Sequence, residues 1–213
     1  MNYSETLAWF FAQLPMFQRV GAPAFKADIS KTQALMRHLG HPEQGLTCIH
    51  VGGTNGKGSV THMLAALFQA AGFRTGLYTS PHLVDFRERI RINGKMIPED
   101  RVVEFVRKHQ AFFTENPFSF FEMTVGLALD YFREAEVDLA VIEVGMGGRL
   151  DSTNVITPQL SVITNVSFDH MQFLGNTLSA IAREKAGIIK PGVPALIGRR
   201  HPETDPVFEH RAA

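Results

Sequence analysis

One segment constrains the fold of this chain most, because it joins an apolar stretch to an amphipathic helix through a glycine-rich turn. The turn covers residues 52–59 and reads Gly-Gly-Thr-Asn-Gly-Lys-Gly-Ser. Gly72 stands where a left-handed cap would end the helix. The apolar positions of the helix are Val60, Met63, Leu64, Leu67, Phe68 and Ala71. This spacing predicts one apolar helix face directly after a strand.

The same turn is suited to bind phosphate groups. Glycines bring backbone N–H groups close to phosphate oxygens, the helix N-terminus adds partial positive charge, and Lys57 supplies a mobile cation. The alternative is a tight turn that only packs the helix on the strand. The general P-loop pattern would place a glycine at Val51 and a hydroxyl at Gly58, so the fit is imperfect, but a lysine between glycines favours phosphate binding. The predicted nucleotide-binding residues are Gly53, Thr54, Asn55, Gly56, Lys57, Gly58 and Ser59.

The rest of the chain alternates short apolar runs with segments of helical period, which is typical of a parallel sheet with crossover helices. The strands are expected at 47–51, 75–79, 138–144, 160–164 and 193–197, with a short antiparallel strand at 89–93. Helices are expected at 30–39, 99–113 and 120–132, and near 181–190; the third is apolar on nearly every side and should be buried. We therefore predict an α/β fold with a mostly parallel sheet and helices on both faces.

Composition excludes several classes of protein. The 213 residues include 21 Lys plus Arg and 21 Asp plus Glu, so no net charge favours nucleic acid. Cys48 is the only cysteine, which excludes an internal disulfide and favours a reducing compartment. The first residues do not resemble a signal peptide, and no stretch is long and apolar enough to cross a bilayer. We expect a cytoplasmic protein with neither nucleic acid nor membrane as partner.

Three polar residues lie near or beyond the carboxyl ends of predicted strands, where ligands gather in open α/β sheets. They are Ser80, Glu143 and His170. Mg²⁺ prefers oxygen ligands, and a carboxylate that ends an apolar strand needs a cation to offset its desolvation. For Glu143 the alternative is an ion pair with a nearby cation. His170 is weaker, since imidazole is an unusual Mg²⁺ ligand, and the neighbouring Asp169 is an alternative ligand or helix cap.

A basic stretch with an aromatic residue lies between the second strand and the next helix. It carries Phe86, Arg87, Arg89 and Arg91. Stacking and charge pairing there could hold a planar, anionic aromatic ligand. A solvated hairpin of mixed charge is the alternative.

The motifs together resemble folylpolyglutamate and dihydrofolate synthases, which belong to the Mur ligase superfamily. The resemblance rests on the form of residues 52–59, on Thr-Ser-Pro-His-Leu at 79–83, on Val-Ile-Glu-Val-Gly-Met-Gly-Gly at 141–148 and on Asp169-His170. It implies an ATP-dependent ligase that adds L-glutamate to a folate or dihydropteroate carboxylate through an acyl phosphate. It also implies two Mg²⁺ ions, and Ser80, Glu143 and His170 match the family's ligands. In that reading Lys57, Glu143, His170 and Lys185 carry the catalysis.

Further residues are assigned through the same resemblance. Lys185 matches a lysine that becomes N-carbamylated and then faces the metal; the alternative is a surface lysine paired with a neighbour. Asp151 matches a position associated with the pterin substrate. With Phe86 and Arg87 of the basic stretch, and with Glu122 as a plausible contact at a helix start, the residues expected to contact the acceptor are His82, Phe86, Arg87, Glu122, Arg149 and Asp151.

The domain organisation is also an expectation. We predict an ATP-binding domain at 1–198 and the start of a linker at 199–213, leading to a glutamate-ligase domain that this chain lacks, in a protein that is a monomer. Two rival functions stay open. One is a P-loop NTPase that forms no amide, and the other is a cell-wall Mur ligase, disfavoured by Gly58 and by the sequence at 80–83.

Overall fold

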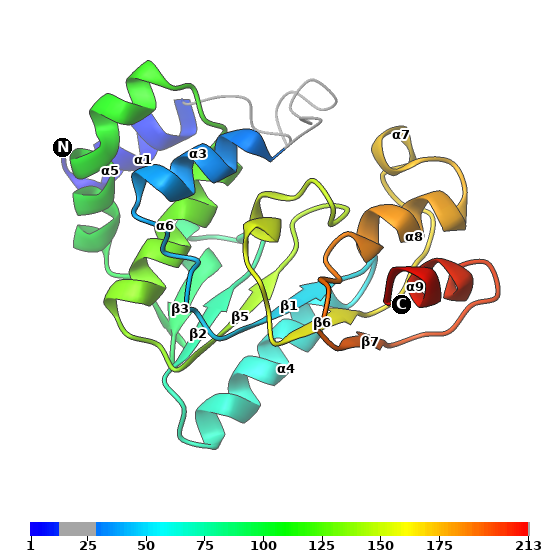
Figure 1. The fold of residues 1–213 in the computed structure, drawn as a ribbon. Coiled ribbons are helices and arrows are strands. Elements are labelled where there is room, and N and C mark those ends of the chain that lie inside the picture. Colours follow the sequence, from blue (N-terminus) through cyan, green and yellow to red (C-terminus); the bar gives the residue numbers. More distant parts are fainter. Residues whose placement is uncertain (13–28, 213) are drawn as a thin grey trace.

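The structure, a computed structural model, describes residues 1–12 and 29–212. These residues form a seven-stranded sheet in the order β4-β3-β2-β5-β1-β6-β7 (Figure 1). The parallel strands are β1 (Cys48–Gly52), β2 (Thr75–Tyr78), β5 (Leu139–Glu143), β6 (Leu160–Ile163) and β7 (Ala195–Ile197). β3 (Ile90–Ile92) and β4 (Lys95–Met96) extend one edge in antiparallel pairing. The mostly parallel α/β fold and the antiparallel strand are confirmed.

Alternating residues of the central strands supply two cores, because successive side chains point to opposite faces of a sheet. Ile49 and Val51 of β1 face α4 (Lys57–Ala70), together with residues of β2, β5 and β6. Cys48 lies in the larger core on the opposite face, which contains α1 (Tyr3–Ala12), α3 (Ser30–His38), α5 (Glu99–Glu115) and α6 (Phe120–Glu134). Helices therefore cover both faces, as predicted.

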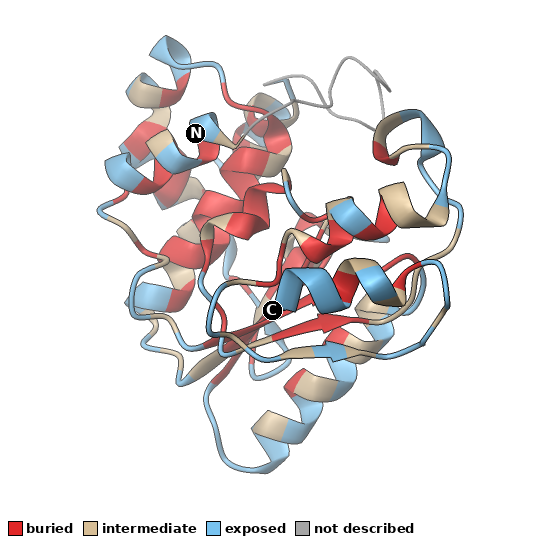
Figure 2. Cartoon of the chain, turned by 45° about the vertical axis from the view of Figure 1, so that its right-hand side comes forward, coloured by how far each residue is buried: buried red, intermediate tan, exposed pale blue. Residues whose placement is uncertain are grey.

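The third core lies beside the β6–β7 edge. There α8 (Leu178–Ala186) and α9 (Asp205–Ala212) pack together, with Phe208 buried between them and the sheet. α7 (Met171–Leu174) precedes α8. Figure 2 shows buried residues along the strands and on the helix sides that face them. Residues 205–212 thus pack on this unit, and the domain boundary predicted after residue 198 stays a prediction.

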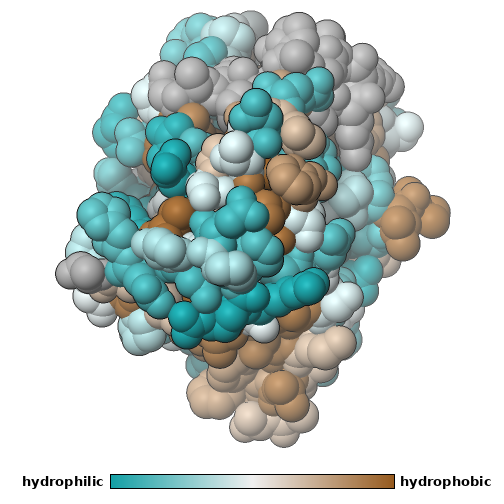
Figure 3. Space-filling view, turned by 90° about the vertical axis from the view of Figure 1, so that its right-hand side faces the viewer, coloured by the Kyte–Doolittle hydropathy of each residue, from teal (hydrophilic) through white to brown (hydrophobic). Residues whose placement is uncertain are grey.

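α4 is the helix of the described chain that covers the second face of the sheet, and its outward side is uncharged. Met63 and Leu67 expose 63% and 66% of their surface. No charged residue occurs between Lys57 and Arg74. Apolar colour accordingly gathers at the end of the molecule where α4 lies (Figure 3). Among the described helices, none combines the length and the apolar character of a bilayer span.

The buried helix α6 begins with a capping box. Ser119 accepts a hydrogen bond from the Glu122 amide at 3.2 Å, and the Glu122 carboxylate accepts from the Ser119 amide at 2.6 Å. Two backbone donors of the first turn are thereby satisfied. We expect Ser119→Ala to lower the free energy of unfolding by about 1 kcal/mol, measured by urea denaturation. Thr114→Ala, at the exposed end of α5, is the control and should change it by less than about 0.5 kcal/mol.

Some elements were missed by the sequence analysis. These are α1, α7, β4 and the 3-10 turns η2 (Phe86–Arg89) and η3 (Ser152–Val155). Each is short or lies at the edge of a larger element. In α1 the fully buried Phe10 packs its ring against Phe86 and Phe120 of α6, and Trp9 packs against Phe113 of α5. Short helices are marginal on their own and depend on such packing.

Candidate active site

The predicted phosphate loop is the connection between β1 and α4. Gly53 and Gly56 have φ values of 139° and 81°, and Gly56 is the N-cap residue of α4. A Cβ atom at Gly53 would lie 1.9 Å from Thr164 Oγ1, so only glycine fits there. These two glycines let the loop turn tightly into α4, whereas the binding of a nucleotide by the loop stays a prediction.

Residues that follow β6 hold this loop in place. Thr54 donates its amide to the Asn165 carbonyl at 2.9 Å, and Thr164 Oγ1 donates to the Asn55 carbonyl at 2.8 Å. Asn165 Nδ2 donates to the same Asn55 carbonyl. The sequence analysis missed Thr164 and Asn165 as supporting residues. Their signal was a pair of polar side chains at the carboxyl end of an apolar strand.

Lys57 begins α4 and has a partly buried side chain. Its Nζ donates to the Thr54 carbonyl at 3.2 Å. No carboxylate of the described residues forms an ion pair with it. A cation that is held only by a backbone carbonyl can turn toward a phosphate at little cost.

Glu143 ends β5 between the segments that carry Lys57 and Ser80. It is level with Val51 in the register and only 4% exposed. Its Oε2 accepts the Ser80 amide at 3.0 Å, while Oε1 lies 3.6 Å from where a Cβ of Gly58 would be. Burial raises the pKa of Glu143; the Ser80 amide and the Lys57 charge act in the opposite direction. Lys57, Glu143 and Ser80 therefore lie at one rim of the sheet.

Lys185 of α8 reaches the phosphate loop from the other side. Its Nζ donates to the Gly53 carbonyl at 2.8 Å, and the residue is 3% exposed. Burial, and then repulsion by Lys57, lower the pKa of Lys185 to about 8, with Asp169 acting in the opposite direction. The alternative of a surface lysine is excluded by this burial.

His170 is the N-cap residue of α7, beyond β6. Its φ is 46°, and Nε2 lies 3.6 Å from Asp169 Oδ2. The side chain is 41% exposed. The described residues contain no group of three or more His, Cys, Asp or Glu suited to a metal ion. A metal at this rim would therefore be held by few protein ligands, and the role of His170 stays a prediction.

Most side chains expected to contact an acceptor have partners within the protein. Phe86 is 2% exposed among other aromatic rings, and Glu122 serves the capping box of α6. Arg87 forms a two-point contact with Asp85, with Nη2 2.7 Å from Oδ2. Phe86 and Arg87 are therefore neither part of a solvated hairpin nor an open stacking surface. The assignment of these three residues to the acceptor stays a prediction.

Arg149 and Asp151 follow the loop after Glu143. Arg149 pairs with Glu184 of α8 at 2.9 Å. Asp151 is 6% exposed and caps η3, accepting the amides of Met146 at 2.9 Å and Thr153 at 3.0 Å. Burial raises the pKa of Asp151 above its ordinary value, and the hydrogen bonds to its carboxylate oppose this effect only in part. Asp151 thus shapes the loop directly after Glu143; its contact with a pterin stays a prediction.

His82 is different, because its ring is only partly buried beside Ser80. The Ser80–Pro81 peptide bond is cis. His82 Nδ1 accepts from Arg89 Nε at 2.7 Å, and Nε2 has no hydrogen-bond partner within residues 1–12 and 29–212. Arg89 is 4% exposed and was not predicted as a site residue. In the sequence, Arg89 was noted only as one of several basic residues in the stretch after the second strand.

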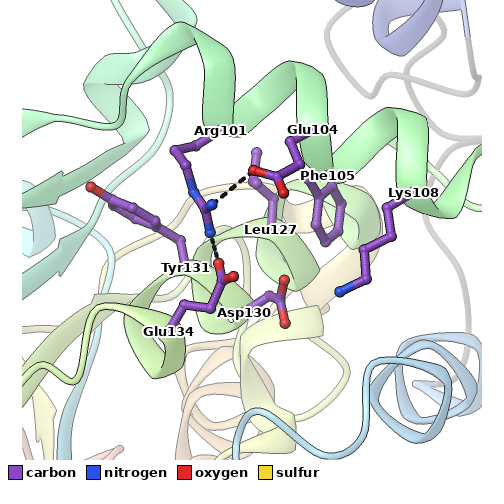
Figure 4. Close-up of a pocket in the computed structure, with 8 residues that line it drawn as sticks. All are labelled: Arg101, Glu104, Phe105, Lys108, Leu127, Asp130, Tyr131 and Glu134. Atoms are coloured by element: carbon purple, nitrogen blue, oxygen red, sulfur yellow. Dashed lines mark hydrogen bonds and ion pairs between the residues drawn. The ribbon is translucent and has the colours of Figure 1, made fainter.

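A small cavity lies between α5 and α6, and none of its lining residues belongs to the glycine-rich turn (Figure 4). It has a volume of about 20 Å³, room for one water molecule. Arg101 points between Glu104, at 2.8 Å, and Glu134, and pairs with both. The Arg101–Glu134 pair links α5 to α6, whereas the Arg101–Glu104 pair lies within α5.

Comparison with known proteins now identifies the fold family. A model of the Mur ligase middle domain matches residues 51–197. The chain belongs to the Mur ligase family. The matched range of this middle domain includes Lys57, Ser80, Glu143, His170 and Lys185.

Relatives place the chain more closely within the family. Folylpolyglutamate synthase from Lacticaseibacillus casei is 43% identical over 223 residues, which cover 100% of this chain and 50% of the relative. Dihydrofolate synthase/folylpolyglutamate synthase from Bacillus subtilis is 38% identical over 217 residues, covering 99% and 49%. The chain therefore spans about half the length of the curated relatives it matches.

Solved structures agree with this placement. A complex described as FPGS-AMPPCP-folate superposes with a TM-score of 0.91 at 41% identity, covering 99% of this chain and 52% of that chain. Escherichia coli FolC in complex with DHPP and ADP gives a TM-score of 0.86 at 30% identity, covering 99% and 49%. The resemblance stated from the sequence motifs is confirmed at the level of family and fold.

Proposed function

We propose that this chain forms the nucleotide-binding part of an ATP-dependent ligase that joins L-glutamate to a carboxylate of a folate or dihydropteroate. The observation that carries the proposal is the meeting of Lys57, Glu143 and Ser80 at one rim of the sheet, with Glu143 bonded to the Ser80 amide at 3.0 Å. A free cation and a buried carboxylate beside a glycine-rich loop are suited to bind a triphosphate and its metal. The folate relatives supply the acceptor class.

In the proposed reaction a carboxylate oxygen of the acceptor attacks the γ-phosphorus of ATP, and the bond to ADP breaks. The amino nitrogen of glutamate then attacks the acyl carbon, phosphate leaves, and a proton is lost from nitrogen. The chain contributes position and charge to the first step. Loop amides and Lys57 would hold the β- and γ-phosphate oxygens, with Lys57 turning away from the Thr54 carbonyl.

The residues at the rim fit magnesium. Glu143 Oε1 receives no hydrogen bond from the described residues and lies next to Gly58, which leaves that oxygen accessible from the loop. We assign Ser80, Glu143, His170 and a carbamate on Lys185 as ligands of two ions, one carboxylate and few other groups being typical of Mg²⁺ that also binds phosphates. When bound, the metal neutralises charge on the transferring phosphoryl group.

Carbamylation of Lys185 is testable without activity. The amine nitrogen would bond to the carbon of CO₂ and release a proton, which requires a neutral amine. With its pKa lowered to about 8 by burial, about half of Lys185 is neutral at pH 8. We expect a carbamate signal in ¹³C NMR after equilibration with ¹³C-bicarbonate at pH 8. The signal should vanish in Lys185→Arg and persist in the exposed control Lys95→Arg; its survival in Lys185→Arg would contradict the assignment.

The extent of the chain limits its expected activity. The chain covers about half the length of the relatives, and in this proposal a glutamate-ligase domain that closes over the nucleotide belongs to their other half. We therefore expect the 213-residue chain to bind ATP weakly and to incorporate ¹⁴C-glutamate into folate at no more than a few per cent of the rate of the Bacillus subtilis relative. Incorporation at a comparable rate would show that the chain needs no further domain.

One assay separates the ligase from the rival NTPase. Release of ADP is measured with the acceptor and glutamate each present or absent, using the chain joined to a relative's second half if the chain alone is too slow. A ligase gives ADP release that needs the acceptor, and an amide product that needs both. ADP release at the same rate without acceptor would support the NTPase and end the ligase proposal.

A further inference from the structure

Arg89 is a buried cation in an unusual setting. It is 4% exposed, yet no carboxylate of the described chain lies within 4 Å of its guanidinium. By contrast, its neighbour Arg87 pairs with both Asp85 and Glu99. A buried, unpaired charge is costly, so its remaining contacts should be specific.

Those contacts surround the guanidinium with polarisable groups and one strong acceptor. Arg89 Nε donates to His82 Nδ1 at 2.7 Å, and the guanidinium carbon lies 5.2 Å from the centre of the Phe120 ring. The buried Tyr78 hydroxyl also faces the guanidinium, and the charge of Glu143 acts on it from a greater distance. Burial lowers the pKa of Arg89, but a guanidinium stays protonated in proteins.

The loop that carries His82 is tied at both ends. The Thr79 amide donates to the Arg89 carbonyl at 3.0 Å and so closes the segment 80–88. The Glu88 carboxylate accepts three successive amides, from Leu83 at 2.8 Å, Val84 at 3.1 Å and Asp85 at 2.8 Å. The His82 ring also rests against the rings of Phe11 and Phe86. The backbone hydrogen bonds of this loop therefore fix the position of His82, in addition to the contacts of its ring.

The Arg89 contact determines which ring nitrogen of His82 carries the proton. A guanidinium N–H can only donate, so Nδ1 must be the acceptor and has no proton. In the neutral ring the proton then sits on Nε2. That nitrogen has no hydrogen-bond partner in residues 1–12 and 29–212, and the ring is partly exposed. His82 thus presents an N–H donor two residues from Ser80.

We propose that Arg89 is a positioning residue that holds His82 as the Nε2–H tautomer, and that His82 donates this hydrogen bond to an oxygen of the folate-type acceptor. This rests on the proposed function for the identity of the acceptor, whereas the tautomer itself does not. Glutamine at position 82 can place an amide N–H near the same point, and methionine cannot. The two substitutions therefore separate hydrogen bonding from packing.

The tautomer is tested on the 213-residue chain by long-range ¹H–¹⁵N NMR of histidine rings at pH 8. The chain has nine histidines, and the signals of His82 are those lost in His82→Gln. We expect an Nε2–H pattern in the wild type and a mixture of tautomers in Arg89→Met. Arg107→Met, on the exposed side of α5, is the control and should leave the pattern unchanged. An Nδ1–H pattern in the wild type would overturn the role of Arg89.

The donor role is tested by calorimetric titration with folic acid and, separately, dihydropteroate, with ADP and magnesium present. We expect His82→Met and Arg89→Met each to weaken acceptor binding about tenfold, and His82→Gln by less than about threefold. Because Arg89 acts through His82, adding Arg89→Met to His82→Met should cause no further loss. Nucleotide affinity should be unchanged throughout. If Arg89→Met does not fold, Arg89→Lys replaces it in these titrations, because lysine keeps the buried charge.

The outcomes distinguish this inference from the proposed function. If the wild type binds acceptor and His82→Met binds it equally well, the donor role is wrong and the ligase proposal stands. If the wild type binds neither acceptor although it binds nucleotide, the donor role and the acceptor assignment both fall. The NMR result would still decide the role of Arg89.

Discussion

Glu143→Gln is expected to abolish the effect of magnesium on nucleotide binding while leaving the chain folded. The wild type should bind AMPPCP more tightly with magnesium than with EDTA. The variant should show no such difference and bind at least about 100-fold more weakly with magnesium, because a metal ligand is lost. The amide oxygen of glutamine can still accept the Ser80 N–H that Glu143 accepts at 3.0 Å. Isothermal titration calorimetry measures both affinities.

The same substitution should stabilise the metal-free protein at neutral pH by about 1 kcal/mol, since a buried carboxylate without a bound cation is costly. Burial raises the pKa of Glu143 above that of the unfolded chain. The carboxyl group therefore favours the folded state below the unfolded pKa of about 4.3, and this contribution is lost as pH rises through the folded pKa. The stability advantage of Glu143→Gln should therefore be absent at low pH, develop as the pH rises through the folded pKa and persist at neutral pH.

Glu115→Gln provides the control, because Glu115 is exposed at the end of α5 and forms no ion pair with the described residues. It should change neither the magnesium effect nor the pH profile of stability. A magnesium effect that survives in Glu143→Gln would remove Glu143 from the metal site. A variant less stable than the wild type at pH 7 without metal would show that the carboxylate has a partner that the structure does not identify.

Lys57→Met is expected to weaken AMPPCP binding about 100-fold and to leave the free energy of unfolding within about 0.5 kcal/mol of the wild type. A charge-assisted hydrogen bond to phosphate contributes roughly 1.5 to 3 kcal/mol. Within residues 1–12 and 29–212 the Lys57 side chain makes one hydrogen bond, to the Thr54 carbonyl at 3.2 Å, so little stability is lost with it. Nucleotide titrations and urea denaturation separate the two effects.

Lys95→Met is the matched control, since Lys95 lies exposed on the short edge strand β4. It should bind AMPPCP as the wild type does. Equal binding by Lys57→Met and the wild type would exclude the glycine-rich turn as the phosphate loop. Loss of structure in Lys57→Met would instead indicate that the lysine maintains the turn.

Several features could be predicted from the sequence because local pattern determines them. The apolar runs located five parallel strands to within about two residues, and the turn at 52–59 was found where β1 meets α4. The role of Glu122, by contrast, could not be decided from the local sequence pattern. Ser119 and Glu122 have the spacing of a capping box, yet Glu122 was assigned to the acceptor, because a carboxylate at a helix start fits either role.

The arginines of the basic stretch show a second limit. Arg87 and Arg89 are two residues apart and equivalent by composition, but Arg87 pairs with Asp85 whereas Arg89 is buried under Phe120 and holds His82. Antiparallel pairing of β3 with β2 brings Arg89 beside Thr79 and so turns it inward. No local pattern carries that information.

The sequence by itself determined the glycine-rich turn between β1 and α4, the alternation of strands and helices and the family, because each depends on residues close together in the chain. The tertiary structure alone decided which polar side chains meet. β5 lies between β1 and β2, which brings Glu143 to Ser80 across 63 positions of sequence, and α8 brings Lys185 to the Gly53 carbonyl across 132. Strand order and helix packing depend on contacts between distant residues, so the site exists only once the sheet has formed.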